Sequence, residues 1–178
     1  NNIIGGGAAG AGNIISANIF SGVIITGATS TGNSVKGNYI GLDITGTTFI
    51  ASSVQSDGVS IVDPAASNTI GGTGAGEGNV LSGNNNSGVY LASLAVGGNS
   101  VLGNIIGPQA NGTANVASNA QTYGVYIMTG SRNNIIGSNA AGARNIISAN
   151  LGYGVYITGV GTAGNTVRGN YIGLDITG

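Results

Sequence analysis

Short runs of valine and isoleucine alternate with glycine and asparagine along the whole chain, and within each run the apolar side chains repeat with a period of two. In residues 22–25, for example, Val23 and Ile25 fall on one face of an extended strand and Ile24 falls on the other. β-branched residues in this pattern suit a pleated sheet, and glycine interrupts every stretch that could form an amphipathic helix. The pattern therefore predicts a chain of short β-strands.

These strands recur in a 66-residue repeat that needs no gaps. Gly5, Gly71 and Gly137 occupy the same place in successive copies, and the chain of 178 residues holds about 2.7 copies. A Gly-Val pair divides each copy into a longer 36-residue part and a shorter 30-residue part, since it recurs in alternating steps at Gly22, Gly58, Gly88, Gly124 and Gly154. Each copy should form two turns of a coil with three short strands per turn, which gives about five turns in all.

Stacking of such turns places like residues on like, so that valine and isoleucine form a core that no single turn could bury. Glycine and asparagine enter the left-handed region at low cost and suit the bends. We therefore expect an all-β fold, a right-handed single-stranded parallel β-helix (a β-solenoid) that forms one domain over residues 1–178. This domain would be a segment of a longer repetitive protein or a fibre subunit. The alternative fold, a β-sandwich, would not require the gapless repeat of turn residues.

Asparagine also recurs at the 66-residue spacing, next to the predicted strands. We expect these side chains to face inward and to form ladders in which each amide bonds to the next turn, because the ~4.8 Å rise between strands suits amide stacking. The two predicted ladders contain Asn33, Asn68, Asn99, Asn134 and Asn165, and Asn38, Asn79, Asn104, Asn145 and Asn170.

Four motif segments, at residues 2–6, 12–18, 22–27 and 32–43, together read Asn-x-Ile-Gly-Gly, Gly-Asn-x-Ile-Ser-x-Asn, Gly-Val-x-Ile-x-Gly and Gly-Asn-x-Val-x-Gly-Asn-Tyr-Ile-Gly-x-Asp. This string resembles the right-handed parallel β-helix repeats of large secreted bacterial surface proteins, which are related in fold to pectate lyases. The resemblance covers the whole chain and implies the fold and an extracellular or cell-surface location. It implies no single activity, because enzymes, adhesins and structural fibres share this fold.

Composition narrows the chemistry further. The chain has no histidine and no cysteine, and only 5% of its residues are charged. Four lysines and arginines cannot form the basic stripe that nucleic-acid binding needs, and no apolar run approaches the ~20 residues of a membrane-spanning helix. We expect Lys36, Arg132, Arg144 and Arg168 to be solvated and without an acidic partner. No cofactor, nucleic-acid or membrane-insertion site is predicted.

The five acidic residues are too scattered for a catalytic pair. Asp43 and Asp175 occupy equivalent positions four turns apart, which is roughly 19 Å at a rise of ~4.8 Å per turn, whereas the paired carboxylates of hydrolases lie ~5–9.5 Å apart. Asp57 and Asp63 flank a single strand. We therefore predict no catalytic residues and no metal site, and we interpret Asp43 as a turn former, with weak calcium binding near Asp43 or Asp175 left open.

Two outward rows are candidate contact surfaces. Tyrosines stack beside the Gly-Val strands and could form a glycan-binding or partner-binding strip, or could simply stabilise the sheet; they are Tyr90, Tyr123, Tyr126, Tyr153 and Tyr156. The second row is entirely apolar and could be a lateral interface between subunits, or could be covered by the long loop at residues 42–56, which carries Ile44, Phe49 and Ile50; it comprises Ile14, Tyr39, Val80, Ile105, Ile146 and Tyr171.

Our leading hypothesis is a non-enzymatic structural or adhesive segment of an extracellular fibre or bacterial cell-surface protein, which associates with itself or with neighbouring repeats end to end or laterally. The alternative is a carbohydrate-binding or polysaccharide-processing β-helix whose active part lies elsewhere, with surface glycans as its partners. Ice binding is a weaker third hypothesis, because it would need a regular threonine ladder and Thr26 and Thr158 do not belong to one.

Overall fold

The computed structural model describes residues 1–50, 55–117 and 121–178. Within these residues the chain forms seventeen β-strands and no helix. All strand pairs within the three sheets are parallel. The predicted all-β parallel solenoid is thus confirmed. Among the described residues there is also no helix with the length and apolarity needed to cross a membrane.

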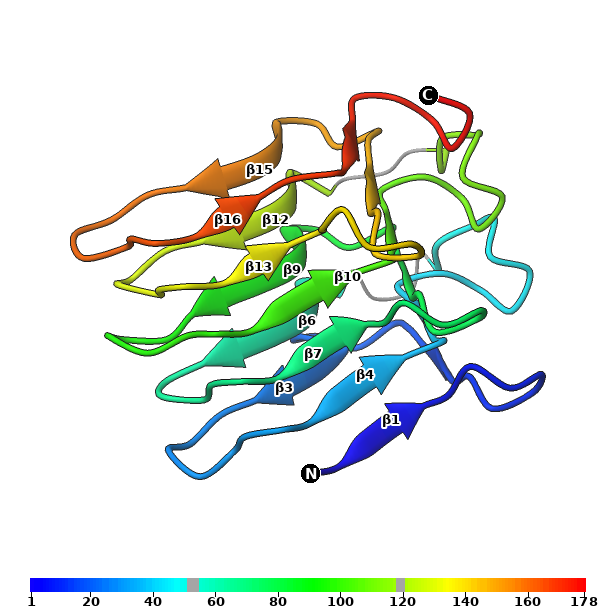
Figure 1. Ribbon diagram of the computed structural model, residues 1–178. Coiled ribbons are helices and arrows are strands. Elements are labelled where there is room, and N and C mark those ends of the chain that lie inside the picture. Colours follow the sequence, from blue (N-terminus) through cyan, green and yellow to red (C-terminus); the bar gives the residue numbers. More distant parts are fainter. Residues whose placement is uncertain (51–54, 118–120) are drawn as a thin grey trace.

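Each turn of the coil contributes one strand to each of three sheets, which we name A, B and C. Sheet A contains β1 (Ile3–Gly5), β4 (Ser34–Lys36), β7 (Thr69–Gly71), β10 (Ser100–Leu102), β13 (Ile135–Ile136) and β16 (Thr166–Val167). Sheet B contains β2 (Ile14–Ile15), β5 (Tyr39–Ile40), β8 (Val80–Leu81), β11 (Ile105–Ile106), β14 (Ile146–Ile147) and β17 (Tyr171–Ile172). Sheet C contains β3 (Val23–Ile25), β6 (Asp57–Val62), β9 (Ser87–Ala92), β12 (Tyr123–Ile127) and β15 (Tyr153–Ile157). In Figure 1 the strands of sheets A and C rise as two neighbouring columns from the N-terminus to the C-terminus.

The register between turns aligns equivalent residues, as the repeat predicts. In sheet C, Val59 pairs with Val89 and Val89 pairs with Val125. All three side chains are fully buried in one continuous core. Because each strand is only two to six residues long, its apolar face is buried by the turns above and below it rather than by its own turn.

The glycine of the Gly-Val pair is required by this core. An added Cβ at Gly124 would overlap Cγ2 of Ile147 and would lie 2.5 Å from the carbonyl oxygen of Gly154. The glycine therefore lets sheet B side chains and the next turn approach the start of each sheet C strand. The recurrence of Gly-Val is thus a packing requirement at the corner between sheets B and C.

Candidate functional surfaces

Asparagine ladders run along two corners of the coil. At the corner that precedes sheet A, Oδ1 of Asn68 accepts hydrogen bonds from the backbone N and the Nδ2 of Asn33, at 2.9 and 2.8 Å, and Asn68 donates in the same way to Asn99. The bonds continue through the predicted set Asn33, Asn68, Asn99, Asn134 and Asn165, and Asn2 extends it at the first turn.

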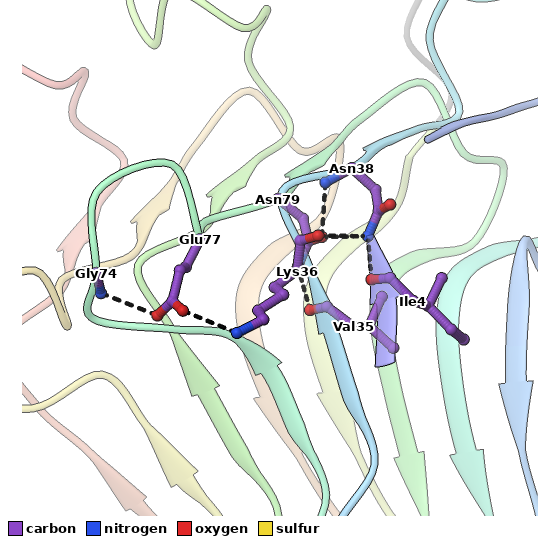
Figure 2. Close-up of polar contacts among 7 residues, drawn as sticks. All are labelled: Ile4, Val35, Lys36, Asn38, Gly74, Glu77 and Asn79. Atoms are coloured by element: carbon purple, nitrogen blue, oxygen red, sulfur yellow. Dashed lines mark hydrogen bonds and ion pairs between the residues drawn. The ribbon is translucent and has the colours of Figure 1, made fainter. Parts of the chain in front are cut away.

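The second ladder lies at the corner between sheets A and B. Asn38 donates from its backbone N and its Nδ2 to Oδ1 of Asn79, at 3.0 and 2.9 Å, and its Nδ2 also reaches the carbonyl oxygen of Ile4 (Figure 2). Nδ2 of Asn79 bonds to the carbonyl oxygen of Val35 at 2.8 Å. The column continues through Asn104, Asn145 and Asn170, and Asn13 adds a first member. From Asn38 onward, each amide therefore bonds to a strand carbonyl and also joins neighbouring turns.

A third amide column, which the sequence analysis missed, lies at the corner between sheets B and C. Here asparagine and glutamine alternate: Nε2 of Gln55 donates to Oδ1 of Asn84 at 2.9 Å, and Nδ2 of Asn84 donates to Oε1 of Gln121 at 3.0 Å. Asn18 and Asn150 complete the column, with bonds of 2.7 and 2.8 Å. The signal was present, because Asn18, Asn84 and Asn150 recur at the 66-residue spacing and so do Gln55 and Gln121. All three corners of the coil are therefore held by side-chain amides.

The five tyrosines predicted to form a strip do form one cluster on the outer face of sheet C. The ring centroids of Tyr126 and Tyr156 are 5.2 Å apart, those of Tyr123 and Tyr156 are 5.5 Å apart, and those of Tyr90 and Tyr126 are also 5.5 Å apart. Several of the rings are nearly parallel, with an interplanar angle of 6° between Tyr123 and Tyr153. Because the rings stack on one another, much of their facial area is taken by neighbouring rings, and hydroxyls and ring edges are left for a partner.

Two carboxylates influence the same face. Burial raises the pKa of Tyr90 first, and the negative charges of ionised Tyr126, Asp57 and Asp63 raise it further. Asp57 is 7% exposed, and its Oδ1 accepts hydrogen bonds from Nδ2 of Asn86 and the backbone N of Ser87. Asp57 therefore has a structural role, because its hydrogen bonds join β6 to the start of β9. As the sequence predicts, Asp57 and Asp63 lie at opposite ends of β6.

The apolar row predicted as a lateral interface lies on the outer face of sheet B, but single-chain contacts bury part of it. Val80 and Ile146 are each only 5% exposed. Val80 belongs to a small apolar cluster that includes Leu42 and Phe49 of the long loop. The other members of this cluster are Tyr39, Ile105, Ala110 and Val116. Burial thus removes Val80 and Ile146 from any lateral contact, which corrects the interface hypothesis at these two positions.

The remaining members of that row are more accessible. Ile14, in the first turn, is 44% exposed. The guanidinium of Arg144 lies 4.1 Å from the ring centroid of Tyr171, so this tyrosine has a cation–π partner in its own chain. Ile44 and Ile50 of the loop are exposed rather than packed on the row. Residues 51–54 of the same loop lie outside the described residues.

The long loops form columns of their own beside sheet B. Successive loops lie on alternate edges of the sheet. Residues 42–50 follow β5 and residues 108–117 follow β11, so these loops lie where the chain leaves sheet B. Residues 72–79 follow β7 and residues 138–145 follow β13, so these loops lie where the chain enters sheet B. Loops of the same edge meet across two turns, because the backbone N of Ala110 donates to the carbonyl oxygen of Gly46 at 2.8 Å. The outer face of sheet B is therefore flanked on both sides.

The acidic residues of the loops form turns. Hydrogen bonds from Thr45, Thr47 and Thr48 reach the carboxylate of Asp43. The pKa of Asp175 lies below its ordinary value because the hydroxyl and backbone N of Thr177 donate to the carboxylate. Within the described residues, no three acidic side chains come together as a metal site.

One ion pair departs from the expectation that the cations lack acidic partners. Nζ of Lys36 lies 2.8 Å from Oε1 of Glu77, and Oε2 of Glu77 accepts a hydrogen bond from the backbone N of Gly74 (Figure 2). The Lys36 hydrogen bond, then the Gly74 bond and the Lys36 charge lower the pKa of Glu77. The pair joins two turns at the corner between sheets A and B.

Comparisons with protein-family models, with curated protein sequences and with solved structures find no significant match for this chain.

Proposed function

We propose that this chain is a non-enzymatic structural rod, a segment of an extracellular fibre or of a cell-surface protein. The observation that carries the proposal is the set of three amide columns, one at each corner, which join every turn to the next. Each column adds side-chain bonds to the backbone ladders of the three sheets, so that turns are linked at their bends as well as along their strands. Such a coil resists local opening, because separating one turn from the next exposes buried amides at three corners.

The chemistry of the described residues supports a structural role. Their acidic groups are engaged in turns, in sheet C and in an ion pair, and the chain carries no histidine or cysteine to act as base, nucleophile or soft metal ligand. The resemblance to β-helix repeats of bacterial surface proteins supports the location. Five per cent charged residues leave a surface that permits close packing between rods.

Limited proteolysis combined with negative-stain electron microscopy tests the proposal. We expect a broad-specificity protease to cut only in the long loops, such as residues 43–50, while the coil stays together as one unit. Electron micrographs should show parallel-sided rods that join into filaments or bundles. Rapid digestion within sheet strands under native conditions, or turnover of an acidic polysaccharide by the purified chain, would refute the structural proposal.

A further inference from the structure

The outer face of sheet C divides into two halves of opposite shape. One outward row reads Ile24, Ser60, Tyr90, Tyr126 and Tyr156 in register from β3 to β15. The C-terminal half of this row is a ridge of rings, whereas the smallest residue, Ser60, lies in the N-terminal half. A hollow of about 330 Å³ opens there, and its walls include Phe20, Ile24, Val62 and Tyr90. A ridge and a hollow thus lie on one face.

The two halves also differ in hydrogen-bonding chemistry. In the described part of the chain, none of the five tyrosine hydroxyls on this face donates to another group. The hollow is lined by Asp57, whose carboxylate is buried and accepts hydrogen bonds from Ser60, Asn86 and Ser87, and Asp63, which follows β6 outside the hollow, accepts from the backbone N of Leu94. Hydroxyl donors that have no acceptor among the described residues therefore occupy the ridge, whereas the Asp57 carboxylate in the hollow is already hydrogen-bonded within the chain.

We propose that sheet C pairs laterally with sheet C of a second copy of this chain, with the two coils antiparallel. The two-fold axis is parallel to β9 and lies midway between the two facing sheets. It reverses the order of the strands but keeps each outward row opposite the same row of the other copy. Since the five strands are evenly spaced at ~4.8 Å, Tyr126 of one copy faces the hollow at Ser60 of the other, and Tyr156 faces Ile24. In the neighbouring row, which is in register from Asp57 to Tyr123, Tyr123 of one copy faces the start of β6, at Asp57, in the other.

The alternative arrangements fit less well. A parallel pair would set ridge against ridge and hollow against hollow, so that the ridges hold the two faces apart and the hollows stay unfilled. A glycan strip would need exposed ring faces, and these rings stack on each other. The antiparallel pair instead uses the ring edges and hydroxyls that remain available, and it is an isologous contact that closes at two copies.

The size of the face sets the expected strength. Five strands at ~4.8 Å and about five residues at ~3.3 Å give a face of roughly 24 by 17 Å. This area of roughly 400 Å² is below the ~800 Å² per partner of a standard stable interface. The pair is therefore expected to be weak and concentration-dependent for this chain, and to strengthen where more turns contribute to the same face.

Sedimentation equilibrium over a range of protein concentrations tests the pairing, which rests on the proposed structural function. The unaltered chain should show a monomer–dimer equilibrium. The double variant Tyr126→Ser with Tyr156→Ser should weaken dimerisation by about tenfold or more, because it removes both anchors. Tyr171→Ser is the matched control: it removes a tyrosine from sheet B and should leave dimerisation unchanged. Circular dichroism verifies that each variant keeps its strands.

Single-cysteine variants test the antiparallel register, since the chain has no native cysteine. Facing sheets lie ~10 Å apart, which is too far for a disulfide, so a short thiol-reactive bifunctional crosslinker is needed. Tyr90→Cys lies on the two-fold axis and should crosslink to its own copy, whereas Tyr156→Cys should not. Equal crosslinking of both would overturn the antiparallel register.

A chain that stays monomeric at every concentration would overturn the pairing, and so would a monomer whose tyrosine fluorescence responds to soluble oligosaccharides. Neither result would contradict the proposal of a structural rod, because the resistance of the coil to proteolysis is measured on the monomer. The two proposals therefore fail separately.

Discussion

Replacing Asn104 by alanine tests the amide ladders most directly. Asn104 is fully buried in the middle of the second column. Its Oδ1 accepts from the backbone N and the Nδ2 of Asn79, and its Nδ2 donates to Asn145 and to the carbonyl oxygens of Ile70 and Leu102, all at 2.9–3.0 Å. Alanine removes all of these side-chain bonds at once.

The expected loss of unfolding free energy follows from what is left without a partner. The backbone N of Asn79 loses its acceptor in a buried position, which costs roughly 1–3 kcal/mol. Nδ2 of Asn79 keeps its bond to Val35, and the carbonyl of Leu102 keeps a bond from Gly72, so the other losses are ordinary ones of roughly 0.5–1.5 kcal/mol each. The sum over these bonds is roughly 3–9 kcal/mol, and we expect a loss toward its lower end, about 4 kcal/mol, because three of the bonds share the single Nδ2 of Asn104.

Asn13→Ala supplies the matched control in the same column. Asn13 lies at the start of the column, and among the described residues its Nδ2 donates to Asn38 alone and its Oδ1 accepts no hydrogen bond. Oδ1 of Asn38 keeps the bond from the backbone N of Asn13, so the control should lose no more than about 1 kcal/mol.

Urea denaturation followed by circular dichroism measures both losses, and hydrogen exchange at the amide of Asn79 reports the local effect. Exchange at this amide should accelerate in Asn104→Ala and stay slow in Asn13→Ala. Equal losses for the two variants, or unchanged protection of the Asn79 amide, would refute the reasoning that the ladder satisfies buried backbone groups.

Three further outcomes are expected. Gly124→Ala should lower the free energy of unfolding by roughly 1–3 kcal/mol because its Cβ overlaps the core; the denaturation midpoints of the variant and the unaltered chain decide this. The pKa of Glu77 in the folded chain is lowered from 4.5. The stability that ionised Glu77 adds is therefore present above pH 4.5 and is lost as the pH falls through the folded pKa. Melting curves of the unaltered chain and Glu77→Gln should therefore differ at neutral pH and converge in acid. Ile146→Ser should lower stability without changing sedimentation, because this side chain is buried; altered association would restore it as an interface residue.

The sequence was sufficient for the fold and for the positions of repeated side chains. Once the 66-residue repeat is recognised, the period-two alternation determines that Tyr126 and Tyr156 share an outward row, and the recurrent asparagines determine two ladders. These features depend only on stacking equivalent residues, so no tertiary information beyond the repeat is needed.

Features that break the repeat were harder to predict. The third column alternates asparagine with glutamine, so no single residue type recurs in every turn. Glu77 is replaced by alanine at the equivalent positions 11 and 143, and its pairing with Lys36 therefore occurs once and leaves no periodic signal. The burial of Val80 depends on how the long loops fold over sheet B, which the strand pattern does not determine.

The alternation of the long loops has a consequence for scattering from aligned material. Sheets A and C repeat their backbone at every turn, but the loops beside sheet B recur only at every second turn, as the contact between Gly46 and Ala110 shows. The strand spacing gives a meridional reflection at ~4.8 Å. An aligned fibre of these coils should add a reflection at about twice that spacing, ~9.6 Å, which a stack of identical turns would lack.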